Sequence, residues 1–514
     1  MRIKDIVNPA YHHSFRLVAA VWLAIAVLAT PAEAQDNYTV TISEENLRIV
    51  HVDAVLRHRQ GLLTMDWESA SHLRDGWASY VFGLEVRGPD GKEVAFRPEG
   101  RASWRLVDAP DTINVSYEVR IGHDYIRWPD GGHNESVYVL DHSLFFVGRA
   151  VFLATTSDVN AQAYENLQVE FVIPDHWKVT TTWNPQPGNP RLYSAHGLRD
   201  LTEIGIYVGE QQQRIIKVGG IETILSAATD FAEALDLIEV TLRPVVPGAV
   251  DFFGGVAGER FALIVNTAPQ TVIDPYFGGG VLSQTMSLST AGLPQGPMVP
   301  ILNHIITHEF LHLWFGIGIS AADSEREYWL SEGFTEYTSL KLMKRLELID
   351  EDHFINAPMS GLEDDVQKYL PVAGAISMRE AGLEKGENYD LIYSGGALVA
   401  FALDLELRES SDMQVGFEDF VQRMYQEFNS DPFDAAKASY AYQDVVRIAS
   451  ELAGKNLQPF FDDYVKGAGV LPIGDYLIKV GIEVALADGE PPRLRSVDPL
   501  SEAQRHLRTA VFVN

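Results

Sequence analysis

The amino-acid sequence predicts a multidomain α+β protein, and two changes of pattern along the chain carry this prediction. Between about residues 37 and 220, short β-branched and aromatic runs alternate with turn residues, as in an antiparallel β domain. From about residue 221, apolar residues recur at helical spacing. With 514 residues, 46% of them hydrophobic, the chain is large enough to bury several cores.

Individual elements can be assigned within both halves. Strands of an N-terminal β-sandwich are predicted at residues 38–42, 77–86, 116–121, 136–140, 168–173 and 205–209. Residues 184–190, rich in Pro and Gly, are predicted to form a loop. Helices are predicted at residues 222–238, 298–315, 329–348, 389–407, 417–428 and 440–452, with one strand at 261–266.

Composition and charge narrow the classes of function. The sequence has no cysteine, which excludes disulfides, thiolate metal sites and a cysteine nucleophile. It has 40 Lys and Arg against 71 Asp and Glu, a net charge of −31. Such a chain has no general attraction for nucleic acid or anionic lipid, so neither is predicted as a partner. The acidity otherwise indicates a solvated surface.

The first 34 residues have the pattern of a signal peptide. Basic residues precede an apolar run at 17–30, and an A-x-A cleavage pattern follows at 32–34. The run is shorter than the roughly 20 residues that a membrane-spanning helix needs. We therefore expect cleavage after Ala34, a periplasmic or secreted protein, and no stable membrane insertion. The alternatives are an uncleaved anchor and a buried core helix.

A metal-binding motif lies in the third predicted helix, where residues 308–312 read HEFLH. On a helix, His308 and His312 project from one face one turn apart, so both imidazoles can bind one zinc ion. Glu309 lies beside them, where it can take a proton from a water that zinc activates.

A catalytic zinc site needs a third protein ligand. His304 shares the helical face but lies two turns from His312, too far for one ion, so we interpret it as a packed or supporting histidine. Glu332, on the next predicted helix, is the candidate ligand. Glu336, one turn later, is a candidate to hold a ligand histidine through its free N–H. By spacing alone, both glutamates could equally be solvated charges on a helix surface.

The motif and its surroundings resemble the gluzincin metallopeptidases, in particular the glycyl aminopeptidase family and, more widely, the aminopeptidase N family. The similarity rests on HEFLHLW at 308–314, WLSEGFT at 329–335 and YSGGALVA at 393–400, and extends more weakly over about residues 40–485. After the signal peptide, the resemblance implies an N-terminal β domain (35–225), a thermolysin-like catalytic domain (226–375), a C-terminal helical domain (376–485) and a tail (486–514).

The resemblance also implies the roles of individual residues. One zinc ion per chain would be held by His308, His312 and Glu332. Glu309 would be the general base. Tyr393 matches the tyrosine whose hydroxyl donates to the oxyanion of the tetrahedral intermediate. The implied function is that of an exported zinc peptidase, an aminopeptidase acting on peptide or protein substrates.

One departure from the family pattern concerns substrate binding. Gly279 and Gly280 stand in the segment whose backbone binds an extended peptide in the family, so they are predicted to contact substrate. The family glutamate that binds the substrate's free amine is missing, with Leu282 or Ser283 in its place. Because a buried ammonium needs a paired charge, an endopeptidase on the same scaffold is an alternative.

Other classes of function also stay open. A non-catalytic binding or chaperone-like relative is one, although the intact ligands, base and tyrosine argue against it. Another hydrolase on the same scaffold is a further alternative. Too few residues follow residue 485 for the PDZ domain that many family members carry, so none is expected.

Overall fold

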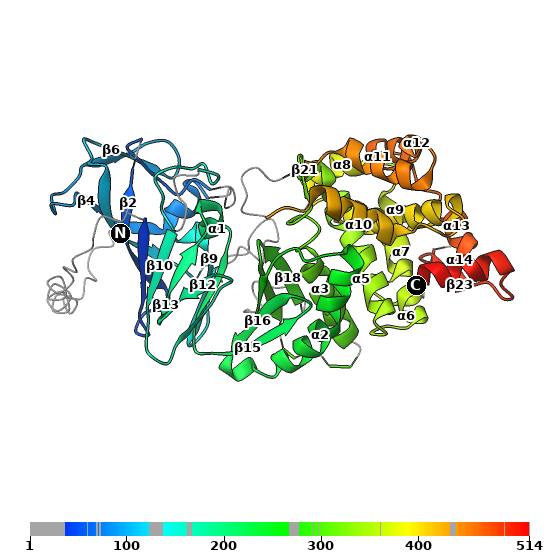
Figure 1. Ribbon diagram of the computed structural model, residues 1–514, viewed down its shortest axis with the longest axis horizontal. Helices are drawn as coiled ribbons and strands as arrows, with labels where there is room; N and C mark the ends of the chain where they lie inside the picture. Colours follow the sequence, from blue (N-terminus) through cyan, green and yellow to red (C-terminus); the bar gives the residue numbers. More distant parts are fainter. Residues whose placement is uncertain are drawn as a thin grey trace, which may run out of the picture. The chain divides into compact units, whose positions relative to one another are not determined.

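The computed structural model describes residues 36–512, apart from 59, 68–69, 71–72, 123–136, 162–166, 267–276, 291, 294, 297, 360, 432–437 and 488. The predicted signal peptide therefore lies outside the described residues. Asp36–Asn514 forms one unit of mixed α and β structure (Figure 1), which confirms the predicted fold class. Among the described residues, no helix combines the length and the apolar character needed to cross a bilayer.

A seven-stranded and a four-stranded sheet share the N-terminal core. Their strand orders are β12-β13-β10-β1-β2-β7-β4 and β11-β14-β9-β8. The strands span Asn37–Ile42 (β1), Ile49–Arg57 (β2), Val81–Arg87 (β4), Thr112–Arg120 (β7), Tyr138–Val139 (β8), Ser143–Val147 (β9), Leu167–Val172 (β10), Lys178–Thr180 (β11), Asn184–Gln186 (β12), Asn189–Ala195 (β13) and Gly205–Gly209 (β14). Every second residue of β1, β2 and β7 is buried, as expected for strands with one face on a core. A three-stranded sheet, β3-β6-β5 (Leu62–Thr64, Ser103–Leu106, Phe96–Pro98), and the short helix α1 (Leu198–Thr202) complete this part.

Three details of the N-terminal part differ from the prediction. The strand predicted at 77–86 begins only at Val81, because Gly76–Tyr80 forms a 3₁₀ helix. β1 pairs in parallel with β10, so the larger sheet is not purely antiparallel. The loop prediction for residues 184–190 is wrong, because β12 and β13 form a hairpin there with Pro187 and Gly188 at the turn. Gly188 has a φ of 84°, which a turn requires and glycine adopts readily. Pro185 is tolerated because β12 is an edge strand.

The second half begins with a mixed sheet in the order β15-β16-β17-β19-β18. Its strands are Gln211–Val218 (β15), Ile221–Ala228 (β16), Arg260–Asn266 (β17), Phe277–Leu282 (β18) and Thr285–Thr290 (β19). The helix predicted at 222–238 is therefore wrong over β16. Nearly all of β16 is buried, so its apolar run lacks the alternation that marks a strand with one exposed face. The predicted single strand at 261–266 corresponds to β17. The first strand of this sheet, β15, begins at Gln211, before residue 225, the predicted end of the N-terminal domain.

Helices form most of the remaining chain. They span Ala234–Phe253 (α2), Met298–Leu311 (α3), Tyr328–Ser331 (α4), Gly333–Arg345 (α5), Glu351–Asn356 (α6), Leu362–Val372 (α7), Met378–Ala381 (α8), Tyr389–Ser410 (α9), Phe417–Phe428 (α10), Tyr442–Ala453 (α11), Gln458–Phe461 (α12), Ile473–Leu477 (α13) and Glu502–Phe512 (α14). Short strand pairs are β20 with β21 (Ser320–Ala321, Ser439–Tyr440) and β22 with β23 (Ile482–Ala485, Arg493–Ser496).

One continuous core runs from the mixed sheet to the C-terminal helix. The ranges 226–375 and 376–485 thus share a core instead of having one each. Residues 486–514, expected as a tail, contain β23 and α14, and Leu494 and Phe512 are buried. The Phe512 ring meets the Phe354 ring of α6 edge-on at 4.9 Å.

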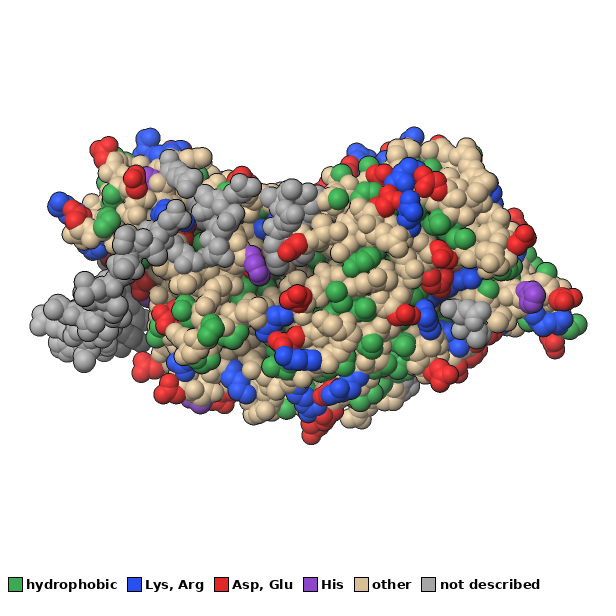
Figure 2. All heavy atoms as spheres, viewed as in Figure 1, with side chains coloured by type: hydrophobic (Ala, Val, Ile, Leu, Met, Phe, Trp, Pro, Cys, Tyr) green, Lys and Arg blue, Asp and Glu red, His purple; other side chains and the backbone are tan. Residues whose placement is uncertain are grey.

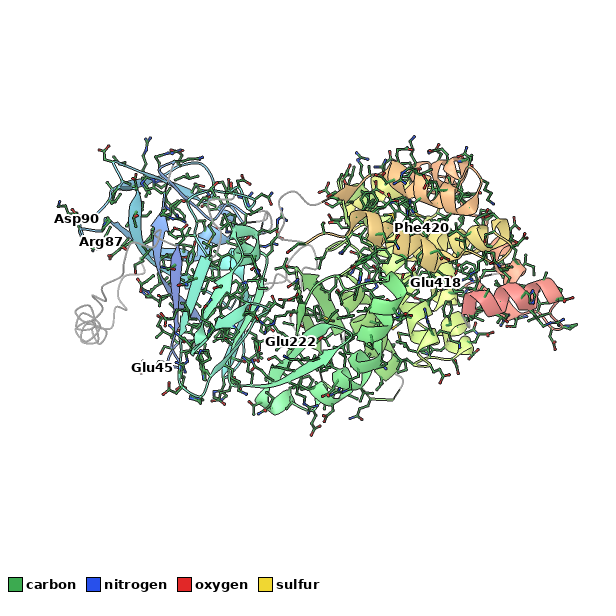
Figure 3. All side chains as sticks on the ribbon, in the orientation of Figure 1. Glu45, Arg87, Asp90, Glu222, Glu418 and Phe420 are labelled. Carbon is green, nitrogen blue, oxygen red and sulfur yellow. The ribbon has the colours of Figure 1, made fainter. Side chains whose placement is uncertain are left out.

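A buried network of charges joins α5, α9 and α10. At its centre lies Asp404 of α9, which is completely buried. Its carboxylate accepts hydrogen bonds from Lys341 Nζ (2.9 Å), the Tyr337 hydroxyl (2.8 Å), Arg408 Nε (2.8 Å) and the Phe417 N–H (2.9 Å). Glu418 of α10, labelled in Figure 3, pairs with Lys341 at 2.8 Å and with Arg408 at 2.9 Å. Two cations thus match two carboxylates, as buried charges require.

The start of α5 and the first half of α9 approach each other through two glycines. A Cβ on Gly396 would lie 2.2 Å from the carbonyl oxygen of Trp329, and a Cβ on Gly333 would lie 2.4 Å from the Cα of Gly396. No side chain fits at either position. Gly333 directly follows Glu332, and Gly396 comes one helical turn after Tyr393. The close approach therefore sets the distance between the backbones that carry these two side chains.

Charged side chains of both signs are interspersed on the face of the molecule in Figure 2. Many form surface ion pairs, such as that of Lys479 with Glu409 at 2.7 Å. Exposed pairs contribute little stability, typically about 0–1 kcal/mol each. The net charge of −31 is in line with a solvated surface.

Candidate metal centre

α3 carries the HEFLH motif against the core. The helix ends at Leu311, one turn short of the predicted end, because residues 313 and 314 turn back with short i→i−3 hydrogen bonds. Gly316, with a φ of 94°, follows this turn. His308 and His312 still lie on one face, with their Nε2 atoms 3.2 Å apart.

Glu332 completes a triangle of ligand atoms with the two histidines. Its Oε2 lies 3.4 Å from His308 Nε2 and 3.2 Å from His312 Nε2. Zinc–ligand bonds of about 2.0–2.1 Å in a tetrahedral site place two ligand atoms roughly 3.3–3.4 Å apart. Oε2 is buried and accepts no regular hydrogen bond from any described residue. Two imidazoles and a carboxylate held in this way fit a zinc ion.

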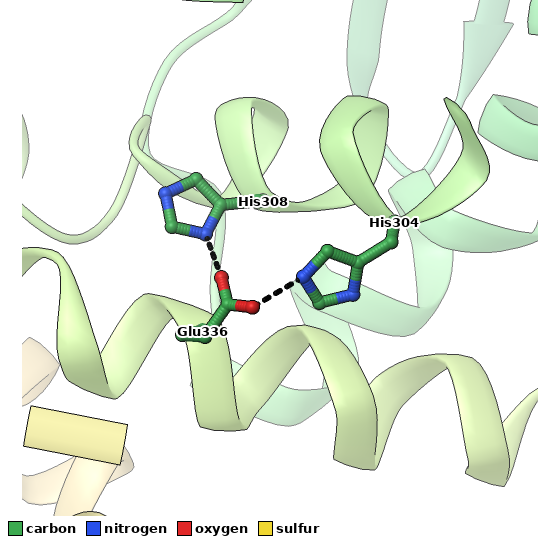
Figure 4. Close-up of side chains that lie close together, drawn as sticks. All are labelled: His304, His308 and Glu336. Atoms are coloured by element: carbon green, nitrogen blue, oxygen red, sulfur yellow. Dashed lines mark hydrogen bonds and ion pairs between the residues drawn. The ribbon is translucent and has the colours of Figure 1, made fainter. Parts of the chain in front are cut away.

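Glu336 connects the metal centre to α5. Its carboxylate lies between two histidines of α3 (Figure 4), with Oε2 2.8 Å from His308 Nδ1 and Oε1 2.7 Å from His304 Nε2. The hydrogen bond to Nδ1 leaves His308 Nε2 for the metal. His304, His308 and Glu336 are also close enough to hold an ion, but both oxygens of Glu336 are already hydrogen-bonded. His312 Nδ1 has its own partner, the Phe315 carbonyl at 3.2 Å.

The charged groups of the centre shift one another's pKa values. Burial alone would raise the pKa of Glu332, but its electrostatic interactions with His312 and Lys385 hold it well below its usual value. The pKa of Glu336 is likewise lowered, against the effect of burial, by His304 and His308. Burial opposes protonation of His308, yet its ion pairs with Glu332 and Glu336 raise its pKa to about 10. A metal ion entering this site would therefore displace a proton.

Two further groups with predicted catalytic roles border the triangle. Glu309 is partly exposed on α3, next to His308. The ring of Tyr393, from the first turns of α9, stacks on the His308 ring at 5.9 Å and on the Tyr389 ring at 3.9 Å. Burial and the negative charge of Glu332 raise the pKa of Tyr393 well above its ordinary value. Its hydroxyl therefore stays protonated and can donate a hydrogen bond.

Sequence reasoning did not identify Lys385. This lysine follows the 3₁₀ turn Gly382–Glu384, and its Nζ lies 2.7 Å from Glu332 Oε1. Nζ also lies 4.5 Å from the centre of the Tyr328 ring and 5.3 Å from that of Tyr393. No motif marks this position, because lysines in helix-connecting segments are common and usually solvated.

The predicted peptide-binding glycines lie on an edge strand. Gly279 and Gly280 belong to β18, the last strand of its sheet, which pairs with β19 and packs against α3. An edge of this kind can pair with an extended peptide. β18 contains no acidic residue, and Ser283 lies in the turn that follows it, with a φ of 52°.

The comparisons with known proteins agree with this architecture. The model of the peptidase M61 N-terminal domain matches residues 37–210, and that of the peptidase family M1 domain matches residues 300–464. No curated protein sequence matches the chain.

Solved structures share the fold. An aminopeptidase N family protein from Idiomarina loihiensis superposes with a TM-score of 0.73 at 18% identity, over 88% of this chain and 79% of that one. An M1 zinc metallopeptidase from Deinococcus radiodurans superposes with a TM-score of 0.55 at 13% identity, over 85% of this chain and 94% of that one. A variant of the Deinococcus enzyme was solved with a Tyr-Ser-Ala substrate and has a TM-score of 0.53 at 13% identity, over the same shares of the two chains.

The M1 domain match and the geometry of the metal centre fit a zinc metallopeptidase, a hydrolase that acts on peptide bonds. The N-terminal part thus matches a domain of the M61 type, and the part that carries the metal centre matches a domain of the M1 type.

Replacing Glu336 with glutamine is expected to weaken zinc binding about 10–100-fold, because partners that orient a ligand histidine typically contribute this much. The zinc dissociation constant would be measured by competition with a chromogenic chelator. Glu363→Gln is the matched control, since Glu363 is also a buried, hydrogen-bonded carboxylate but binds Arg493 and the Leu494 N–H. Equal zinc affinity in Glu336→Gln and the wild type would contradict the role of Glu336.

Proposed function

We propose that this chain is exported and hydrolyses peptide bonds as an aminopeptidase that uses one zinc ion per chain. The triangle formed by His308, His312 and Glu332, in which a buried carboxylate oxygen faces two imidazole nitrogens, is the observation that carries this proposal. The aminopeptidase assignment is supported by the structural similarity to an aminopeptidase N family protein and to an M1 enzyme bound to a tripeptide.

The chain's own groups account for the proton transfers. Zinc, when bound to His308, His312 and Glu332, would supply a Lewis acid that polarises the substrate carbonyl. Glu309 takes a proton from the attacking water and then passes it to the leaving amine. The Tyr393 hydroxyl, kept protonated by its surroundings, donates to the oxyanion that develops during the attack. The backbone of Gly279 and Gly280 on β18 holds the substrate in an extended conformation.

An endopeptidase is the second candidate, and the absence of any acidic residue from β18 favours it. The decisive comparison uses amino-acyl chromogenic substrates and the same peptides with an acetylated N-terminus, all assayed with the zinc-loaded chain. An aminopeptidase cleaves only those with a free amine. Cleavage of the acetylated peptides at internal bonds, with no release of N-terminal residues, would instead establish the endopeptidase.

Export is proposed from the pattern of residues 1–34. The full-length gene product, expressed in a Gram-negative host, should be found in the periplasmic fraction with Gln35 as its first residue. N-terminal mass spectrometry would test this. Recovery of the chain with Met1 intact would contradict the proposal.

Replacing Tyr393 with phenylalanine is expected to lower kcat about 10²–10³-fold with little change in KM, because the hydroxyl stabilises charge that exists only in the transition state. Steady-state kinetics on one good substrate would measure both constants. Tyr389→Phe is the matched comparison, since Tyr389 stacks on Tyr393 from the same helix. The reverse pattern, with loss only in Tyr389→Phe, would assign the oxyanion donor to Tyr389.

A further inference from the structure

The two oxygens of the Glu332 carboxylate have different partners, because Lys385 forms an ion pair with only one of them. Oε1 lies 2.7 Å from Lys385 Nζ, whereas Oε2 lies 3.2 Å and 3.4 Å from the Nε2 atoms of the two motif histidines. Glu332 is only 7% exposed, so the carboxylate has little room to exchange its oxygens. Each oxygen therefore faces a different partner.

Two aromatic rings and the packed backbone hold the lysine in place. Its Nζ lies close to the Tyr328 ring and, somewhat further away, to the Tyr393 ring. The 3₁₀ turn that precedes Lys385 packs tightly, since a Cβ on Gly382 would lie 1.8 Å from the carbonyl oxygen of Glu325. The Lys385 carbonyl accepts a hydrogen bond from the Asn388 N–H at 3.2 Å. The ammonium is therefore directed at Glu332 from a fixed segment.

It matters for catalysis that only one oxygen of Glu332 faces the metal centre, because a carboxylate can bind a metal through one oxygen or through two. A catalytic zinc site needs three protein ligands and one free position for water or substrate. A glutamate that turned both oxygens to the metal would crowd that position. An ammonium on Oε1 prevents this and also balances the carboxylate's charge.

We propose that Lys385 is a positioning residue of the metal centre, which holds Glu332 as a ligand through Oε2 alone and so keeps one coordination position free. This inference rests on the proposed zinc site. It extends the set of functional residues to a segment between α8 and α9 that contains no recognised motif.

The test replaces Lys385 with methionine, which keeps an unbranched aliphatic side chain and removes the ammonium. The metal-free protein would be loaded with Co²⁺, whose visible spectrum reports the number and arrangement of ligands. We expect weaker visible absorption in Lys385→Met than in the wild type, as five-coordinate Co²⁺ absorbs less than four-coordinate Co²⁺. Lys385→Arg, which can still donate to Oε1, should restore most of the wild-type spectrum.

Lys479→Met is the matched control. Lys479 pairs with Glu409 at 2.7 Å, lies 4.9 Å from the centre of the Tyr476 ring, and its side chain is 32% exposed, against 33% for Lys385. It lies outside the metal centre, so this variant should keep the wild-type spectrum. If Lys385→Met failed to fold, Lys385→Gln would be measured in the same way.

The cobalt spectrum decides the outcome. A spectrum of Lys385→Met identical to that of the wild type, or an equal change in Lys479→Met, would overturn the role of Lys385 whatever the zinc affinity. Failure of the wild type itself to bind cobalt or zinc would overturn the proposed zinc site instead. The two failures are therefore distinguishable.

Discussion

Replacing Glu309 with glutamine is expected to lower kcat/KM for peptide hydrolysis by about 10²–10⁴-fold, the range that general acid–base catalysis contributes. Glutamine has nearly the same shape, but it cannot take a proton from water or return one to the leaving amine. Because Glu309 supplies none of the three ligand atoms of the metal triangle, zinc should remain bound. The change would therefore separate proton transfer from metal binding.

The Glu309 experiment combines hydrolysis rates with the zinc content of the purified protein and its melting temperature. Glu325→Gln is the control, since Glu325 is an exposed glutamate of the connection between the two metal-binding helices. Wild-type rates in Glu309→Gln would refute the assignment of the base. Loss of zinc together with activity would instead give Glu309 a role in metal binding.

Replacing Asp404 with asparagine is expected to destabilise the folded chain by about 3–5 kcal/mol, the typical effect of removing one partner from a buried ion pair. Lys341 and Arg408 would then share the single carboxylate of Glu418. An amide also cannot accept the four hydrogen bonds that the carboxylate accepts. Because the network joins the helices that carry Glu336 and Tyr393, loss of packing here should reach the metal centre.

Chemical denaturation followed by circular dichroism would measure this effect. Glu409→Gln is the matched control on the same helix, because Glu409 forms a partly exposed pair with Lys479 and should change stability by less than about 1 kcal/mol. Equal stability of Asp404→Asn and Glu409→Gln would show that the network does not stabilise the fold.

The same network predicts a dependence of stability on pH. Burial alone would raise the pKa of Asp404, but Lys341 and Arg408 hold it below its ordinary value. A carboxyl group with a lowered folded-state pKa stabilises the protein fully above its unfolded pKa of about 3.9, and this stabilisation is lost as the pH falls through the folded value. Acid titration of the wild type and Asp404→Asn should therefore show the difference in stability shrinking below about pH 4.

The sequence predicted well those elements whose ends and apolar face can be recognised within a short stretch of residues. α10 matches its predicted range because Gly416 precedes it and its apolar residues lie on one face. The metal triangle could be proposed because His308 and His312 have a fixed helical spacing, and because the surroundings of Glu332 resemble a known family. The resemblance, rather than spacing, distinguished Glu332 from an ordinary surface glutamate.

Features that depend on distant parts of the chain could not be predicted in this way. β16 resembles a helix in its apolar content, and only its neighbours β15 and β17 make it a strand. Lys385 acquires its partner through the packing of α9 against α4, which no spacing along the sequence reveals. The same holds for Asp404, whose partners on α5 and α10 come from separate segments.

The contact between Gly333 and Gly396 limits how this enzyme could be stabilised by engineering. Replacing a helical glycine with alanine usually adds about 0.5–1 kcal/mol of stability, because alanine is the better helix former. At these two positions the added methyl group would meet backbone atoms within 2.2–2.4 Å and force two helices apart. The absence of a side chain at both positions is thus a condition for bringing Glu332 and Tyr393 together. Variants selected for thermal stability should therefore retain both glycines, despite their poor helix propensity.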